Sequence, residues 1–163
     1  MWIAVLMCLI GSVAAQPTRP NFAGTWVEDE SLRKSTMTAP TSGPQSRALP
    51  PSDTVVKQTA ADLTTERSFM SNVIRHVYRL DGSESVNKNG ANTMTTRSTW
   101  DGAKLVTTGT SFSATSAGEF LWQYKEVRWL EKSGAMVIET TTTDEAGKTN
   151  VVTRTFRRKA QNP

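Results

Sequence analysis

Residues 92–112 read NTMTTRSTWDGAKLVTTGTSF, and this stretch decides the fold class of the chain. It holds two runs rich in threonine and other strand-favouring residues, on either side of Asp101-Gly102, a dipeptide that favours a β-hairpin turn. Within the first run, one face carries Met94, Thr96, Ser98 and Trp100. Because side chains alternate between the two faces of a strand, the stretch predicts two antiparallel strands joined by a tight turn.

The same pattern continues along most of the chain. Asp81-Gly82 and Lys88-Asn89-Gly90 mark two more turns, and no helical stripe of apolar residues follows Lys34. About nine or ten strands are predicted, in the segments 21–28, 54–59, 63–69, 73–80, 83–86, 92–100, 104–112, 119–131, 135–143 and 149–158. Short strands joined by hairpins predict an all-β, antiparallel up-and-down meander, as either a closed barrel or a sandwich.

One strand shows a change of phase. In residues 119–131, one face carries Phe120, Trp122 and Tyr124, whereas Val127 and Trp129 lie on the other face. A one-residue shift turns all later side chains to the opposite side unless a bulge absorbs it. We therefore expect a β-bulge or a sharp bend near Lys125-Glu126.

The first fifteen residues have the pattern of a signal peptide. An apolar run at residues 2–10 is followed by the small residues Val13-Ala14-Ala15, although no Lys or Arg precedes the run. The run is shorter than the roughly 20 residues that a membrane-spanning helix needs. We expect removal of residues 1–15 on export, a periplasmic or secreted location, and no transmembrane segment in a mature chain that begins at Gln16. The alternative is a buried first strand or helix.

The remaining chain is expected to form one domain. Residues 16–20 are predicted to be an extended leader and residues 21–159 a single β-domain, whose size suffices for one core. Residues 35–52 hold four prolines and no acidic residue, and so predict a long loop. Loops of this length are usually functional or disordered, and both options stay open.

Residues for common catalytic and metal sites are scarce. Cys8 is the single cysteine and lies within the expected signal peptide, which excludes disulfides and thiolate sites from the mature chain. His76 is the single histidine, so no histidine cluster is available for zinc. No nucleophile elbow or phosphate-binding glycine loop is present. We expect no enzymatic activity, no metal and no cofactor.

The aromatic residues provide the best candidates for a binding site. They gather on single faces of separate predicted strands, and the candidate ligand-binding residues are His76, Tyr78, Trp100, Phe120, Trp122 and Tyr124. Such faces form either an ordinary barrel core or a cavity lined by aromatic and small polar side chains. An eight-stranded barrel is just wide enough to hold one small ligand.

Basic residues gather near the C-terminus. The formal net charge is +4, and no acidic residue follows Glu145. Arg154, Arg157, Arg158 and Lys159 could face an anionic surface, or simply form a solvated edge. Because no recognisable nucleic-acid motif accompanies them, nucleic acid is not an expected partner.

Short motifs carry a resemblance to a known family. Phe22-Ala23-Gly24-Thr25-Trp26, Lys34-Ser35 and the proline-rich loop resemble the opening of small exported bacterial lipocalin-like proteins of the calycin superfamily. Leu80-Asp81-Gly82 and Trp100-Asp101-Gly102 are similar to their repeated turns. The second and third lipocalin motifs and the usual disulfide are absent.

The resemblance implies both a fold and a function. It implies a lipocalin-like barrel of about 8–10 strands, closed at one end by Trp26, with Arg154 stacked on that indole, or Arg157 as the alternative. It further implies an exported protein that binds a small apolar or amphiphilic ligand, with residues 35–52 over the mouth. The alternative is a non-enzymatic structural or interaction protein of the cell envelope whose barrel is filled.

Overall fold

The computed structural model describes residues 18–36, 53–69, 72–116 and 118–160, and most of them lie in antiparallel strands. The expected signal peptide and most of the proline-rich loop lie outside the described residues. One 3₁₀ turn, η1, spans Glu30–Leu32. The strands are β1 (Gly24–Glu28), β2 (Lys34–Ser35), β3 (Thr54–Gln58), β4 (Asp62–Phe69), β5 (Asn72–Arg79), β6 (Glu84–Asn89), β7 (Asn92–Asp101), β8 (Lys104–Thr115), β9 (Gly118–Leu130), β10 (Met136–Thr143) and β11 (Thr149–Arg158).

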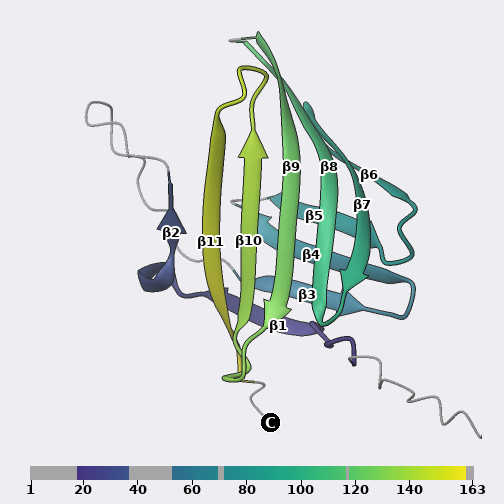
Figure 1. Ribbon diagram of the computed structural model, residues 1–163, viewed down its shortest axis with the longest axis vertical. Coiled ribbons are helices and arrows are strands. Elements are labelled where there is room, and N and C mark those ends of the chain that lie inside the picture. Colours follow the sequence, from purple (N-terminus) through teal and green to yellow (C-terminus); the bar gives the residue numbers. More distant parts are fainter. Residues whose placement is uncertain (1–17, 37–52, 70–71, 117, 161–163) are drawn as a thin grey trace, which may run out of the picture.

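The strands follow one another as an up-and-down meander that nearly closes on itself. Their order is β5-β4-β3-β1-β11-β10-β9-β8-β7-β6, and the two-residue β2 pairs with β11. In Figure 1, β8 to β11 stand upright while β3, β4 and β5 cross behind β8 and β9, so the single sheet curves round to enclose one interior. The predicted all-β meander and the barrel are confirmed, and the ten predicted segments correspond to the ten strands that form its wall.

Of the β-bulge or sharp bend expected near Lys125-Glu126, the bulge is wrong. Residues 123–130 of β9 pair one-for-one with residues 143–136 of β10, and β8 pairs with β9 without interruption. The apolar phase changes because buried Glu126 and Arg128 occupy the inner face while Val127 and Trp129 lie on the outer face. The ammonium of Lys104 lies 5.1 Å from the outer ring of Trp129. The inner face of β9 therefore changes from aromatic to charged side chains, while the backbone register stays the same.

The strands at the two ends of this order, β5 and β6, are joined by hydrogen bonds from side chains rather than by a backbone ladder. Asn87 on β6 is buried, accepts a hydrogen bond from the Val77 amide at 2.8 Å and donates one to the Val77 carbonyl at 3.0 Å. The Ser85 hydroxyl accepts a hydrogen bond from the Arg79 amide at 2.9 Å. These three bonds form a seam between β5 and β6 that closes the barrel.

We expect Asn87→Ala to lower the free energy of unfolding by about 1–3 kcal/mol, because it leaves both polar groups of Val77 without their partner. Urea unfolding measures the loss, and amide exchange at Val77 should accelerate. Lys88→Ala is the control, since that exposed residue lies on the same strand and points outward. Equal losses in the two variants would contradict a closing role for Asn87.

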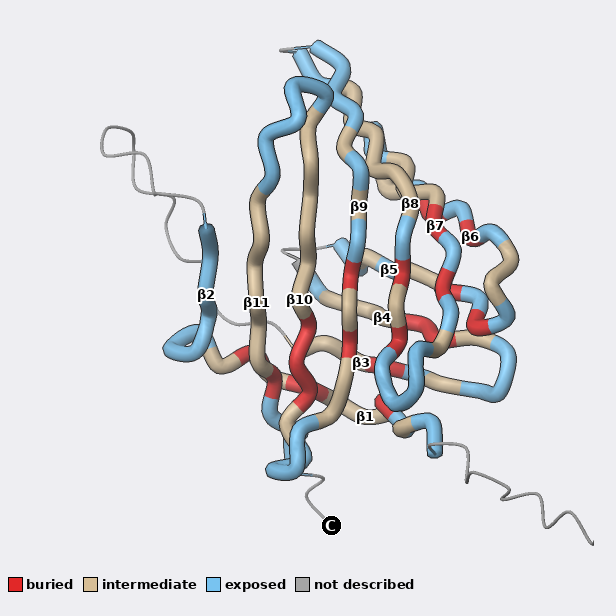
Figure 2. Tube along the Cα trace, viewed as in Figure 1, coloured by how far each residue is buried: buried red, intermediate tan, exposed pale blue. Residues whose placement is uncertain are grey.

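The apolar core fills one end of the barrel. This closed end holds Phe22, Trp26, Val56, Leu63, Tyr78, Leu80, Leu105, Met136, Ile138 and Phe156. Figure 2 shows buried residues concentrated there, while the strands become more exposed toward the far end, where β8 turns into β9 and β10 into β11. The two halves therefore differ, and among the described residues the dense apolar core lies at the closed end.

Trp26 closes this end, as expected, but its cationic partner differs from the prediction. Its indole is fully buried, and Nε1 donates a hydrogen bond to the Phe22 carbonyl at 2.8 Å. The guanidinium of Arg158, and not that of Arg154 or Arg157, lies over the ring at 4.6 Å. The register explains this, because β1 and β11 place Trp26 directly opposite Arg158.

Candidate functional site

A polar cluster occupies the interior above the apolar core. Tyr124, Glu126 and Arg128 alternate along β9, so all three point inward. Arg128 Nη2 donates a hydrogen bond to Glu126 Oε1 at 2.8 Å, and the Tyr124 hydroxyl donates one to Glu126 Oε2 at 2.6 Å. Arg128 is 3% exposed and Glu126 is 8% exposed. The cluster is therefore a buried ion pair with a tyrosine attached.

Aromatic rings surround the arginine of this pair. The rings of Phe22 and Tyr78 each lie 5.9 Å from the Arg128 guanidinium carbon. In the register of the sheet, Leu105 of β8 and Ile138 of β10 lie on either side of Arg128. The cation thus marks the boundary between the apolar core and the more polar half of the interior.

The cluster keeps its protons over the ordinary pH range. Burial, and to a lesser degree the Glu126 carboxylate, raises the pKa of Tyr78 and that of Tyr124 well above the usual tyrosine value. Burial alone would lower the pKa of Arg128, but Glu126 and the two tyrosines raise it overall. This cluster therefore presents two neutral tyrosine hydroxyls and the permanent cation of Arg128.

Several buried polar atoms have no hydrogen-bond partner among the described residues. They include Nε and Nη1 of Arg128, together with the hydroxyls of Thr96 and Thr140. Thr140 lies directly across from Glu126 in the pairing of β9 with β10. Buried polar groups are almost always satisfied, by protein, water or ligand. We therefore expect water or a bound molecule to supply partners for these atoms.

A second ion pair lies near the closed end of the barrel. Glu28 of β1 is buried, and its Oε1 is 2.7 Å from Arg33 Nη2 and 3.8 Å from Arg154 Nε. Arg154 lies opposite Ile138 in the register of β10 and β11, which places it on the inner face. Both buried glutamates of the described chain are therefore matched by arginine.

His76 lies beside the cluster on β5. Its Nδ1 is 3.4 Å from the Tyr78 hydroxyl. Burial lowers the pKa of His76 below its ordinary value of 6.5, the nearby Glu126 acts in the opposite direction, and Arg128 adds to the lowering. The imidazole is therefore neutral at pH 7, and it can serve as a hydrogen-bond partner but not as a cation.

This shift gives the stability of the protein a pH dependence. Below about pH 6.5 the unfolded chain binds a proton at His76 before the folded chain does, so the folded state loses stability as the pH falls through this window. We expect the melting temperature of the wild type to fall more steeply than that of His76→Gln between about pH 7.5 and pH 5. Parallel curves for the two proteins would contradict a depressed histidine pKa.

The structure brings together three of the six residues that the sequence suggested. His76, Tyr78 and Tyr124 belong to the cluster. Trp100 lies at the closed end, where its ring stacks on Phe22 with the centroids 6.0 Å apart. Phe120 and Trp122 lie toward the far end and stack on each other at 5.7 Å. The aromatic residues thus mark both ends of the interior as well as its middle.

The sequence analysis does not predict the two ion pairs. It interprets the pattern near Lys125-Glu126 as a change of phase in the strand. A signal was present, because strict alternation from Trp122 places both Glu126 and Arg128 on the inner face.

Small side chains lie beside Phe120 and Trp122 on the inner face of the far half. They include Ser111, Ser113, Thr140 and Thr142, all only partly buried. Phe120, on the same inner face, is 40% exposed. Solvent therefore reaches the inner face at this end.

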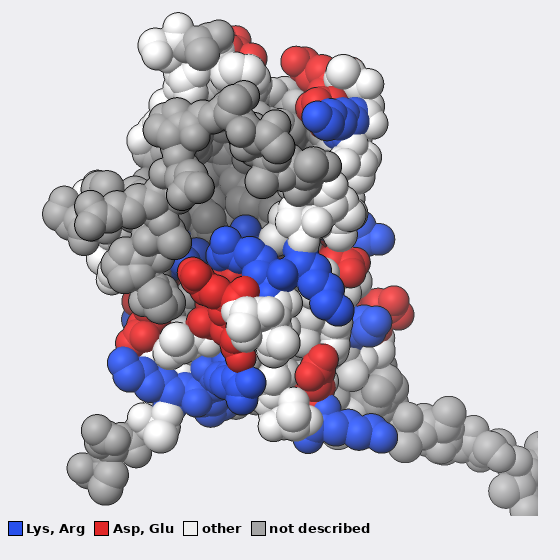
Figure 3. Space-filling model, turned by 90° about the vertical axis from the view of Figure 1, so that its left-hand side faces the viewer, with Lys and Arg blue, Asp and Glu red and all other residues white. Residues whose placement is uncertain are grey.

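The basic residues of β11 occupy different environments. Arg154 faces the interior, whereas Arg157 pairs with Asp29 at 2.9 Å and Lys159 pairs with Asp53 at 2.7 Å. Arg158 donates a hydrogen bond to the Ala23 carbonyl at 2.6 Å. Figure 3 shows acidic and basic side chains side by side on this face of the molecule. The cations at the surface therefore have local partners.

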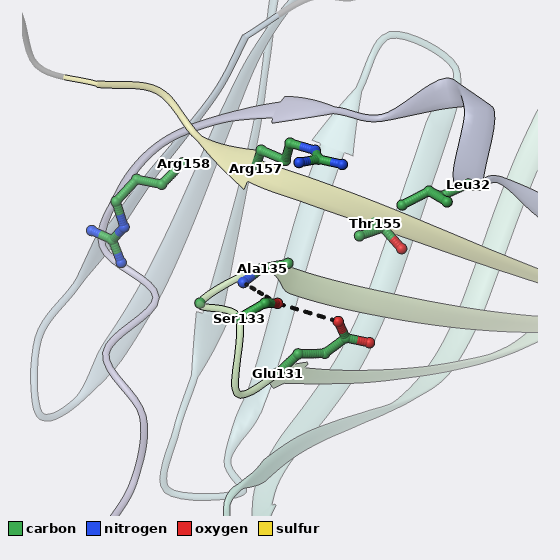
Figure 4. A pocket seen from close by; sticks show the side chains of 8 residues that line it. Leu32, Glu131, Ser133, Ala135, Thr155, Arg157 and Arg158 are labelled. Carbon is green, nitrogen blue, oxygen red and sulfur yellow. Dashed lines mark hydrogen bonds between the residues drawn. The ribbon is translucent and has the colours of Figure 1, made fainter.

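A surface pocket of about 530 Å³ lies on the outside of the closed end. Arg157, Arg158, Thr155 and Leu32 come from β11 and η1, and the turn between β9 and β10 supplies the rest of the lining (Figure 4). Its serine, Ser133, bonds to Glu131 within that turn. Among the described residues no group of three or more potential ligands could hold a metal ion, and no helix is long and apolar enough to cross a membrane.

Comparisons with known proteins agree on the architecture. No family model and no curated protein matches the sequence. Among solved structures, the fatty acid transporter REP1-NXSQ matches with a TM-score of 0.57 and 16% identity, over 86% of this chain and 97% of its own. Apo lipid binding protein 8 of Caenorhabditis elegans matches at 0.55 and 12%, over 85% and 95%. Human cRBP IV matches at 0.52 and 13%, over 86% and 99%. At these identities the likenesses establish the fold alone, and this chain shares the barrel fold of these proteins.

Proposed function

We propose that this protein binds a small apolar or amphiphilic molecule inside its barrel and performs no catalysis. The observation that carries the proposal is the buried Arg128, whose Nε and Nη1 have no partner among the described residues. Two proteins of the same fold are named for carrying or binding fatty acid or lipid, which supports this function. The described residues show no group for metal-assisted chemistry.

The interior offers a different contact to each part of an amphiphile. The polar group of the ligand meets Arg128 and Tyr124 in the middle of the barrel. Its apolar part lies toward the far end, against Trp122 and Phe120, which are already stacked on each other. Covering these partly exposed rings contributes about 25 cal/mol for each Å² of apolar surface removed from water.

The proposal includes export to the periplasm or the medium. Its support is the apolar run at residues 2–10 followed by Val13-Ala14-Ala15. Intact mass of protein recovered outside the cytoplasm should show a chain that begins at Gln16. A recovered protein that retains Met1 would contradict export by this route.

A thermal-shift and tryptophan-fluorescence titration tests the binding function. The probes are decanol, decanoate and methyl decanoate, added to the full chain. Binding to the folded state alone adds RT ln(1 + [L]/Kd), about 2.7 kcal/mol when the ligand is at a hundredfold excess over Kd. We expect at least one probe to raise the melting temperature and change the emission.

Two tryptophans of β9 form a matched pair of variants. Trp122→Leu removes an indole from the inner face, and Trp129→Leu removes one from the outer face. Trp122→Leu should abolish most of the change in emission, and Trp129→Leu should preserve it. If no apolar probe affects either signal, the binding function fails and a structural or interaction protein with a filled barrel takes its place.

A further inference from the structure

We infer that the polar group of the bound molecule is uncharged, a hydroxyl or carbonyl, and that the barrel discriminates against carboxylates. This inference rests on the proposed binding function and specifies the class of ligand. The ligand is an amphiphile such as a medium- or long-chain alcohol, an ester or an acylglycerol.

The charge of Arg128 is already balanced from within the protein. Glu126 Oε1 lies 2.8 Å from Arg128 Nη2, and the side chains of Arg128 and Glu126 are 4% and 11% exposed. Tyr124 fixes the second oxygen of Glu126 at 2.6 Å, so the carboxylate cannot turn away without breaking that bond. The pair has no net charge, and the interior therefore has no unmatched cation at this point.

A carboxylate ligand would disturb this balance. It would approach the same guanidinium as Glu126, and two anions would then share one cation inside the barrel. Taking an ion out of water costs several kcal/mol, and only a full counter-charge repays that cost. Close like charges add repulsion that is stronger in the interior than in water.

Two other cations face inward. Arg154 Nε lies 3.8 Å from the carboxylate of Glu28, which Arg33 also contacts at 2.7 Å, and this Nε has no hydrogen-bond partner among the described residues. Arg67 shares a face of β4 with buried Leu63, and it is engaged in an interaction. A fatty acid headgroup at Arg154 would lie beside the buried carboxylate of Glu28, and one at Arg67 would compete with an existing partner.

An uncharged oxygen atom of a ligand suits the two nitrogen atoms of Arg128 that have no partner. Nε and Nη1 of Arg128 are donors that need an acceptor, and a hydroxyl or carbonyl oxygen accepts from them without displacing Glu126. A ligand hydroxyl can also donate, and the unpartnered hydroxyl of Thr140 lies directly across from Glu126. His76 is neutral, so it adds no positive charge.

Glu126→Gln should reverse the selectivity. Glutamine keeps the shape and one acceptor oxygen for Arg128 but removes the negative charge, so the guanidinium becomes an unmatched cation. The variant should bind a carboxylate more tightly than the corresponding alcohol. Glu139→Gln, on the outer face of neighbouring β10, is the matched control and should keep the selectivity of the wild type.

The experiment measures Kd by fluorescence titration at pH 8 for decanol, methyl decanoate and decanoate. In the wild type, decanol and methyl decanoate should bind about tenfold more tightly than decanoate, a difference of about 1.4 kcal/mol. In Glu126→Gln the order of decanol and decanoate should reverse. Methyl decanoate is the uncharged ester of decanoate, so comparing these two ligands in the wild type tests the effect of charge even if Glu126→Gln does not fold.

The outcomes separate the two proposals. Decanoate binding as tightly as decanol and methyl decanoate to the wild type overturns the neutral-ligand inference and leaves the binding function intact. A wild type that binds none of the three overturns the binding function itself. An unchanged preference in a folded Glu126→Gln protein shows that the ion pair does not set the selectivity.

Discussion

Glu126→Ala should lower the free energy of unfolding by about 3–5 kcal/mol, because it leaves the guanidinium of Arg128 buried without a counter-charge. Arg128 is 3% exposed and has one charged partner in the described chain, at 2.8 Å. The variant also removes the acceptor of the Tyr124 hydroxyl. Urea unfolding of the wild type and the variant measures the loss.

Two further variants test whether the unpaired charge of Arg128 causes this loss. The double variant Glu126→Gln/Arg128→Met removes both charges and should recover most of the stability, since a neutral interior needs no ion pair. Glu84→Ala breaks the exposed pair with Arg97, whose side chain is 60% exposed, and should cost no more than about 1 kcal/mol. A loss in Glu126→Ala as small as that in Glu84→Ala would show that the buried pair is not essential to the fold.

Trp26→Ala should cost a similar amount, about 3–5 kcal/mol, the usual range when a buried tryptophan is truncated. The indole is fully buried in the core of the closed end, and its Nε1 hydrogen bond to the Phe22 carbonyl would be lost. We expect the variant to melt at a clearly lower temperature while its far-UV circular dichroism keeps the signature of a β-sheet.

A double-mutant cycle tests the contact between the Arg158 guanidinium and the Trp26 ring. Trp26→Ala and Arg158→Ala should couple by about 0.5–1 kcal/mol, the range for a cation over an aromatic ring at an exposed site. Arg157→Ala is the control, because that residue pairs with Asp29 and should be additive with Trp26→Ala. Coupling to Arg157 in place of Arg158 would refute the observed register of β1 and β11.

The strands and turns were predictable because their signals are local. Gly82 and Gly102 adopt φ values of 84° and 57°, which glycine reaches without strain, and both follow an aspartate as the hairpin rule expects. The partner of Trp26 was not predictable in the same way. It depends on the pairing of the first strand with the last, and one strand offers Arg154, Arg157 and Arg158 within five residues.

The candidate site was predictable only in its aromatic half. Tyr78 and Tyr124 stand out because they are large and alternate with polar residues. Glu126 and Arg128 do not, since charged residues in a strand ordinarily face water and are rarely buried unless paired. Their pairing within one strand, two residues apart, made burial possible, and the resulting polar inner face was mistaken for a shift of phase.

The side-chain seam between β5 and β6 has a consequence for how copies of the protein behave at high concentration. If it opened, two strands would become free edges, and free edges readily pair with other chains. Arg75 and Arg79 on β5 and Lys88 on β6 are exposed along these strands and would repel a second copy. The Asn87 and Ser85 bonds therefore guard against self-association, and a protein weakened at the seam should aggregate sooner in high salt, where charge repulsion is screened.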